Sequence, residues 1–156
     1  MKKIILMVFA IILMSCGSSK VVNNAEKTIK GNWSLSSITY SKTGTYDVTL
    51  LNDAKKECFE ASTWQFIPNN HTGTYTIINS ECATGDRYFN FTIQEVSYEA
   101  GHYDFLLKPT NEKGKSETNQ GFRMKITLLT DTEMQWQQSV DVNGVPFIIN
   151  MNFSKL

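Results

Sequence analysis

Residues 121–154 decide the fold class, and they read GFRMKITLLTDTEMQWQQSVDVNGVPFIINMNFS. Apolar and polar residues alternate through three runs, which are separated by Thr130-Asp131-Thr132 and by Val142-Asn143-Gly144. Alternation with a period of two gives a β-strand one apolar face, and short polar segments of this composition are typical of turns. The stretch therefore predicts three consecutive antiparallel strands, each with one face in a core.

The same alternation continues through the rest of the chain after Gly31, and no long helical period interrupts it. Most connections between the alternating runs are short, so sequential strands should pair as neighbours. Strands of this kind can close into a barrel or fold into two packed sheets, and the alternation allows both arrangements. We predict eight strands, at about residues 32–40, 62–67, 73–79, 87–96, 102–108, 121–129, 133–140 and 146–154.

Two of the predicted connections are long. Residues 41–61 join the first two strands and contain Asn52–Glu57, for which we expect a short helix capped by Asn52. Residues 109–120 are charged and contain Gly114, a composition that is typical of a mobile surface loop.

The start of the chain has the pattern of an export signal. Lys2 and Lys3 precede an unbroken apolar run from Ile4 to Met14, and Ser15 and Cys16 follow it. A run of this length rises only about 16 Å as a helix, which is too short for a bilayer core of about 30 Å. Residues 1–15 therefore predict a cleaved signal peptide rather than a membrane-spanning anchor.

Leu13-Met14-Ser15-Cys16 resembles the lipobox of bacterial lipoproteins. The resemblance implies cleavage before Cys16 and acylation of Cys16, which would anchor the chain in a membrane of the cell envelope. No aspartate follows Cys16, and no acidic cluster follows either, so lipoprotein sorting favours the outer membrane and its periplasmic face. The expected organisation is a signal peptide over 1–15, a lipidated Cys16 with a polar tether over 16–29, and one domain over 30–156.

Charge and cysteine content bear on two further expectations, the class of partner and the presence of a disulfide. Cleavage removes Lys2 and Lys3 and leaves 13 basic and 15 acidic residues, which argues against a nucleic-acid partner. Lipidation would use Cys16, and export places the other two cysteines in an oxidising compartment. Opposing residues of an antiparallel hairpin have a constant sum of numbers, and a turn centred on Asn70 sets Cys58 opposite Cys82. We predict a disulfide between them.

Several short motifs resemble those of the lipocalins. Gly31-Asn32-Trp33 opens the first predicted strand as the Gly-x-Trp motif does, and Thr130-Asp131 falls where classical lipocalins carry Thr-Asp-Tyr. Trp64–Phe66 followed by Thr72–Tyr75 is similar to the second and third strands of the lipocalin-like domains of small Bacteroidetes-type lipoproteins. The resemblance covers residues 30–156 and implies an all-β fold, an eight-stranded antiparallel up-and-down barrel with Trp33 at its closed end.

One departure from the lipocalin pattern concerns the last strand. Classical lipocalins pack an arginine of that strand over the motif tryptophan, whereas this chain offers only Lys155 there. The departure weakens the link to classical ligand-carrying members. If Trp33 fills the closed end, the 41–61 segment and the 80–86, 109–120 and 141–145 loops lie at the mouth. Inward-facing residues would then be the candidate ligand-binding set: Trp64, Phe89, Tyr103, Phe105, Leu107, Phe122, Gln138 and Phe147.

Two functions follow from this fold, and the state of the barrel interior separates them. A hollow barrel would bind a small hydrophobic molecule, whereas a filled barrel would act as a structural or protein-interaction module of the envelope. No nucleophile or phosphate-binding motif is present, so we expect no enzyme. His71 and His102 lie in or next to different turns without further ligands at zinc spacing, so we expect neither a metal nor a cofactor.

Overall fold

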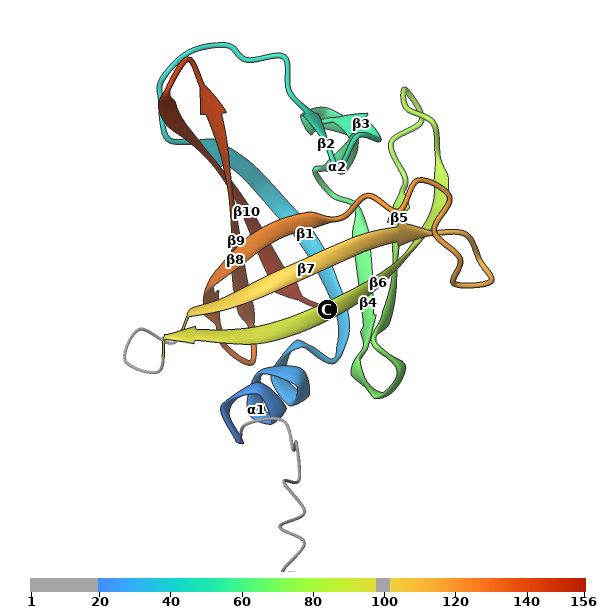
Figure 1. Cartoon of the computed structure of the whole chain (residues 1–156). Helices are drawn as coiled ribbons and strands as arrows, with labels where there is room; N and C mark the ends of the chain where they lie inside the picture. The colour runs from blue at the N-terminus through green and yellow to red at the C-terminus, as the bar shows by residue number, and fades with distance from the viewer. Residues whose placement is uncertain (1–19, 98–101) are drawn as a thin grey trace, which may run out of the picture.

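The computed structural model describes residues 20–97 and 102–156, which form a closed antiparallel barrel (Figure 1). This result confirms the predicted barrel and excludes the alternative of two packed sheets. The predicted signal peptide, Cys16 and residues 98–101 lie outside the described residues. All eight predicted strands are present, with ends that differ by at most two residues: β1 Gly31–Tyr40, β4 Thr63–Ile67, β5 Thr72–Ile77, β6 Gly85–Ser97, β7 His102–Thr110, β8 Phe122–Leu129, β9 Glu133–Val142 and β10 Val145–Lys155.

The barrel is closed by β1, which pairs with β4 on one side and with β10 on the other. Trp33 of β1 lies opposite Trp64 in β4 and opposite Lys155 in β10. The remaining strands pair with their sequence neighbours, as short connections require. Closure leaves β1 and β10 without a free edge along their paired length, which removes a template for aggregation.

Aromatic side chains fill the interior of the barrel. The indole of Trp64 on β4 lies 5.4 Å, between ring centroids, from the indole of Trp136 on β9. The ring of Phe66, also on β4, lies 6.2 Å from that of Phe105 on β7. Because β4 is not adjacent to β7 or β9, these contacts cross the lumen. Among the described residues, nine aromatic side chains are at most 2% exposed: Trp33, Phe59, Trp64, Phe66, Phe89, Phe91, Phe105, Trp136 and Phe153.

A helix closes one end of the barrel. Residues 17–29 read as a polar tether in the sequence, whereas Lys20–Ile29 form α1 and bury Ala25 and Ile29 against the barrel (Figure 1). The tether expectation is therefore wrong for this stretch. Val22, Ala25 and Ile29 recur at helical spacing, and this short apolar stripe is easily overlooked in a segment that is otherwise polar. The backbone oxygen of Ile29 accepts a hydrogen bond of 2.7 Å from Trp33 Nε1, which ties α1 to the motif tryptophan.

The 41–61 connection, which we call the lid segment, folds into a small hairpin and a helix over the opposite end. The hairpin consists of β2 Thr49–Leu50 and β3 Ala54–Lys55, and α2 spans Lys56–Phe59. The predicted helix over 52–57 is wrong in its bounds, because Leu51 and Asn52 have positive φ angles and form the β2–β3 turn. Asn52 is thus a turn residue and not a helix cap. A 3-10 turn, η1 Pro68–Asn70, connects β4 to β5.

Gly73 gives a direct test of how tightly the interior is packed. A Cβ atom at this position would lie 2.2 Å from Phe89 Cζ and 2.8 Å from the Gln65 backbone oxygen. Overpacking of this kind typically costs 1–3 kcal/mol, so Gly73→Ala should lower the free energy of unfolding by about 2 kcal/mol in urea denaturation. Gly121→Ala is the matched control, because its Cβ would meet only the Leu107 backbone oxygen at 3.5 Å. Equal stability of the two variants would contradict the packing described above.

Candidate functional site

The two ends of the barrel differ. The closed end carries α1, and the open end carries the lid segment, the 78–84 loop, the 111–121 loop and the β9–β10 turn (Figure 1). Functional surfaces in barrels usually form at the loop-bearing end, because a rigid scaffold positions variable loops there. The candidate site therefore has to be sought between the lid segment and the rim strands.

Three of the candidate ligand-binding residues, Trp64, Phe89 and Phe105, belong to the aromatic filling. Trp64 Nε1 donates a hydrogen bond of 2.9 Å to Ser62 Oγ, and Ser62 is itself fully buried. The Phe105 ring stacks on Trp136 with 4.4 Å between centroids. Tyr103 is half-buried and lies opposite Ile126 in the ladder. Trp64 and Phe105 therefore pack against other rings inside the barrel.

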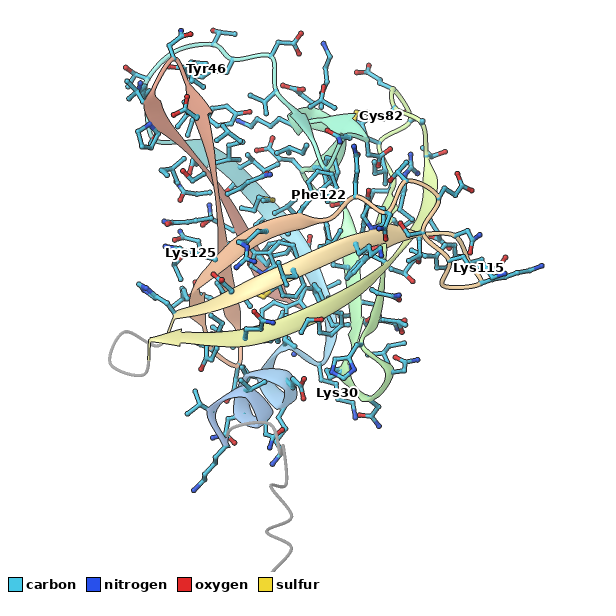
Figure 2. All side chains as sticks on the ribbon, in the orientation of Figure 1. Lys30, Tyr46, Cys82, Lys115, Phe122 and Lys125 are labelled. Carbon is cyan, nitrogen blue, oxygen red and sulfur yellow. A yellow bond between two sulfur atoms is a disulfide. The ribbon has the colours of Figure 1, made fainter. Side chains whose placement is uncertain are left out.

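The other candidates lie nearer the rim but do not meet at one point. Phe122 and Gln138 are half-buried on β8 and β9 (Figure 2 labels Phe122). Phe147 packs against Tyr46 of the lid segment, with 4.8 Å between ring centroids, and against Tyr40 at the end of β1, with 5.4 Å between centroids. Of the eight candidates, Phe89 and Leu107 line one cavity at the open end, the cavity of about 430 Å³ described next. The eight residues therefore do not line one continuous chamber.

That cavity, which we call the rim pocket, has a volume of about 430 Å³ and opens between the β2–β3 turn and the ends of β5, β6 and β7. Phe89 and Leu107 provide apolar surface to it, while Asp53 and Arg87 stand on its wall. Its volume is within the range of small-molecule sites, which are mostly apolar with a few placed polar groups. The pocket is lined by Leu51, Asn52, Asp53, Tyr75, Asp86, Arg87, Tyr88, Phe89, Leu107, Pro109, Thr110, Asn111 and Glu112.

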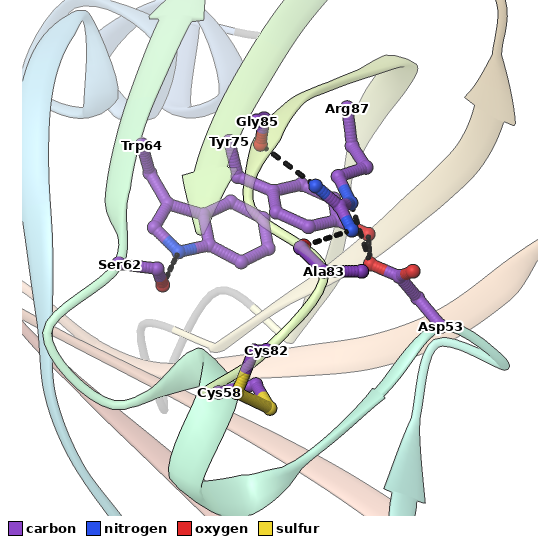
Figure 3. A network of polar contacts seen from close by, with 9 residues as sticks. All are labelled: Asp53, Cys58, Ser62, Trp64, Tyr75, Cys82, Ala83, Gly85 and Arg87. Atoms are coloured by element: carbon purple, nitrogen blue, oxygen red, sulfur yellow. Dashed lines mark hydrogen bonds and ion pairs between the residues drawn. A yellow bond between two sulfur atoms is a disulfide. The ribbon is translucent and has the colours of Figure 1, made fainter. Parts of the chain in front are cut away.

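A polar latch fixes one wall of the rim pocket (Figure 3). Arg87 Nε and the Tyr75 hydroxyl donate hydrogen bonds of 3.0 Å and 2.9 Å to the same oxygen, Oδ2 of Asp53. The two remaining Arg87 nitrogens donate to the backbone oxygens of Gly85 and Ala83, at 2.8 Å and 2.6 Å. Burial raises the pKa of the Tyr75 hydroxyl well above its ordinary value, and the Asp53 carboxylate adds to the effect. Arg87 is thus satisfied within the protein and holds the lid turn rather than a ligand.

The predicted disulfide is present. Cys58 of α2 and Cys82 of the 78–84 loop are bonded, with 5.8 Å between their Cα atoms (Figure 3). The numbers of opposing residues in the β4–β5 ladder sum to 139, for example Trp64 with Tyr75. A turn centred on Asn70 requires a sum of 140, so the observed register differs from the predicted one by one residue. Asn79 Nδ2 also donates a 3.1 Å hydrogen bond to the Glu57 backbone oxygen. The lid segment is therefore held by the latch at its turn and by the disulfide at its helix.

The lipocalin motif residues meet at the closed end. The Lys155 ammonium lies 4.3 Å from the centroid of the Trp33 ring, a cation–π contact, and donates hydrogen bonds to the backbone oxygens of Thr28 and Lys30. Burial lowers the pKa of Lys155, and the nearby Asp131 carboxylate opposes the shift. Lys155 thus occupies the place that the lipocalin resemblance assigns to an arginine.

Gly31 and Thr130 complete this end. Gly31 has a φ of +111°, a backbone conformation that residues with a side chain rarely adopt. Thr130 Oγ1 accepts hydrogen bonds from the backbone nitrogens of Thr132 and Glu133 across the β8–β9 turn. These residues hold strands, α1 and the turn together, so their role in this protein is structural.

The latch was not predicted from the sequence, although the residue pattern carried a signal for it. Arg87 shares its strand face with Phe89 and Phe91, and Tyr75 shares its face with Ile77. An arginine at an inward-facing position needs a buried partner, because an unpaired charge is costly to desolvate. The partner, Asp53, lies far away in sequence on the lid segment, and only the fold brings the two together.

The described part of the chain offers neither a cluster of metal ligands nor a membrane-spanning helix. Residues 20–97 and 102–156 contain no group of three or more histidine, cysteine, aspartate or glutamate side chains that could hold a metal ion. His71 Nε2 instead lies 3.3 Å from Glu26 Oε1 of α1. Within the same residues, no helix has the length and apolar character needed to cross a bilayer.

The disulfide predicts a measurable stability difference. It closes a loop with a sequence separation of 24 residues, for which the chain-entropy relation gives about 3 kcal/mol. The double variant Cys58→Ser/Cys82→Ser should lose about that much free energy of unfolding in urea. Finding two titratable thiols at these positions in the exported, denatured and unreduced wild-type protein would refute the bond.

The latch predicts a local effect on the lid turn. Arg87→Met removes the guanidinium hydrogen bonds to Asp53, Gly85 and Ala83 and leaves the hydrogen bond from the Tyr75 hydroxyl to Asp53. In a hydrogen-exchange measurement, the backbone amide of Asp53 should therefore exchange about tenfold faster than in the wild-type protein. Arg123→Met is the control, because Arg123 pairs with Asp104 on the outer surface, away from the lid. Unchanged protection of the Asp53 amide in Arg87→Met would show that the lid turn is held by other contacts.

The chain was compared with family models, curated proteins and solved structures, and one solved structure with a TM-score above 0.5 agrees with the observed fold. No family model matches the chain, and no curated protein matches its sequence. The crystal structure of a lipocalin-like protein from Bacteroides uniformis is similar, with a TM-score of 0.51 and 10% sequence identity over 83% of this chain and 99% of that one. A protein from Bacteroides eggerthii, described as uncharacterized, has a TM-score of 0.48 and 12% identity over 81% of this chain and 98% of that one. The barrel of this chain is lipocalin-like in fold.

Proposed function

We propose that this chain is a bacterial lipoprotein, exported by residues 1–15 and held in the cell envelope by acyl chains on Cys16. The basic start, the short apolar run and the Leu13-Met14-Ser15-Cys16 sequence support this proposal. Two or more acyl chains make a durable anchor, because each buried methylene contributes about 0.8 kcal/mol. The residues after Cys16 favour the outer membrane, with the domain facing the periplasm.

Within the envelope, the barrel serves as a rigid structural or protein-interaction module. The observation that carries this assignment is the filled lumen: rings from β4, β7 and β9 touch across it. An eight-stranded barrel is just wide enough either to be filled by side chains or to hold one small ligand, and here side chains occupy the space. Binding then has to use the outer surface and the loops.

The open end offers features suited to a protein partner. Val142 and Val145 face each other across the β9–β10 turn, and each is 47% exposed. The β8–β9 ladder ends at the Lys125–Gln137 pair, whereas β9 continues to Val142. The last residues of β9 therefore have no ladder partner on the β8 side. Exposed apolar side chains beside an unpaired strand edge favour association with another chain.

A second candidate function is the binding of one compact molecule in the rim pocket. The observation in its favour is the pocket volume of about 430 Å³ above Phe89 and Leu107. Because the latch uses the donors of Arg87, recognition would rest on the apolar surface and on Tyr88, Asn52 and Asn111. Below the pocket, Phe89 packs against the rings of Trp64 and Phe66, so this function suits a compact ligand rather than a long acyl chain.

Native mass spectrometry of the protein released from its own envelope separates the two functions. The filled barrel predicts the mass of the acylated chain alone, with no small molecule in stoichiometric amount. A co-purified molecule that disappears in Thr110→Trp, a change at the edge of the rim pocket, would support the second function. A co-purified molecule that persists in Thr110→Trp and disappears in an interior variant would overturn the filled-barrel account.

A further inference from the structure

The outer side of α1 carries a basic stripe. Lys20, Asn23, Asn24 and Lys27 are exposed and recur at helical spacing on the side opposite the buried Ala25 and Ile29. Lys30 is exposed directly after the helix. The single acidic residue of α1, Glu26, is directed to His71 of the neighbouring β4–β5 connection. We call this exposed side the closed-end surface.

The chain length before α1 limits how far this surface can be from the anchor. Cys16 precedes Lys20, the first residue of α1, by four positions. A fully extended chain covers at most about 3.5 Å per residue, so the two Cα atoms are no more than about 14 Å apart. Any acyl chain on Cys16 thus draws the closed-end surface to the depth of the lipid head groups.

The open end cannot reach the same membrane in that position. β10 has eleven residues and runs between the two ends of the barrel. With a rise of about 3.3 Å per residue and the usual tilt of barrel strands, the barrel is about 25 Å or more in height. The rim pocket and the lid segment therefore lie at least that far beyond α1.

We propose that the closed-end surface lies against anionic lipid head groups of the anchoring membrane, and that the open end faces away from it. This proposal rests on the proposed lipid anchor at Cys16. Lys20, Lys27 and Lys30 supply the charge that anionic head groups attract, and they stand on the surface that the anchor brings down. Among the residues whose exposure is described, Asp131 and Glu133 are exposed acidic side chains at this end; Asp131 lies in the β8–β9 turn and Glu133 begins β9, so neither belongs to the helix stripe.

The orientation determines which molecules can meet the open end. A lipid of the anchoring membrane would have to leave the bilayer and cross about 25 Å of water to enter the rim pocket. Val142, Val145 and the lid segment instead face the aqueous compartment and whatever protein stands there. The open-end partner is therefore taken from the aqueous side.

Depth-dependent fluorescence quenching tests the orientation in the acylated, full-length mature protein. A coumarin-bearing amino acid replaces either Asn24 on the closed-end surface or Glu112 at the open end, and the protein is placed in phosphatidylcholine–phosphatidylglycerol vesicles with a nitroxide on the choline head group. We expect quenching at least threefold stronger at position 24 than at position 112. Equal quenching at the two positions, or stronger quenching at position 112, would overturn the proposal.

Two further variants separate the orientation from the anchor. The double variant Lys20→Glu/Lys27→Glu should reduce quenching at position 24 in anionic vesicles. It should still migrate with the vesicles in a density-gradient flotation assay, because the acyl anchor is intact. Cys16→Ser should not migrate with the vesicles in the flotation assay. A mass spectrum of the wild-type chain that shows no acyl groups would refute the proposed anchor. In that case Cys16 is coupled to a maleimide lipid, and the same comparison of positions 24 and 112 decides whether the closed end faces the bilayer.

Discussion

The packing of aromatic rings across the barrel lumen is the interaction on which the rest of the structure depends. Trp64 and Phe66 extend from β4 toward Phe105 and Trp136 on strands that are not their neighbours. Aromatic pairs of this kind contribute both buried area and favourable ring geometry. They also dictate local choices, such as glycine at position 73, where only a hydrogen atom fits beneath the ring of Phe89. A lumen that is filled in this way makes the barrel a rigid body whose chemistry lies on its surface.

Different interactions hold the segments that cover the two ends of the barrel. At the closed end, Trp33, Lys155 and α1 are joined by a cation–π contact and by hydrogen bonds from both side chains to backbone oxygens at the end of α1. At the open end, the lid segment is held covalently through Cys58 and electrostatically through Asp53. Fixing the lid at two points restricts its motion, so the rim pocket keeps a defined wall. Leu51, held at a positive φ in the lid turn with its side chain buried, is part of that restriction.

The alternation and the short turns predicted the eight strands and the pairing of sequence neighbours well, because alternation reports which side of a strand is buried and short turns impose the pairing. The closure into a barrel was predicted from the lipocalin resemblance, since alternation alone also allowed two packed sheets. The disulfide also followed from hairpin arithmetic, even though the β4–β5 register differs by one. Three features did not follow. The apolar stripe of α1 is too short to stand out, the lid hairpin depends on a turn with Leu51 and Asn52 at positive φ, and the latch joins Asp53 to Arg87 across 34 positions. Whether the lumen is hollow is a matter of summed side-chain volume in three dimensions, which alternation does not report.

Xenon binding followed by NMR tests the filled lumen most directly, because dry apolar cavities take up xenon whereas close-packed interiors do not. The readout is the indole Nε1–H resonance of Trp64 and of Trp136, both buried in the lumen. The account predicts small shifts that stay linear with xenon pressure at both indoles. A saturable shift at either indole would reveal an enclosed cavity, and it would contradict the conclusion that this lipocalin-like barrel is filled by its own side chains.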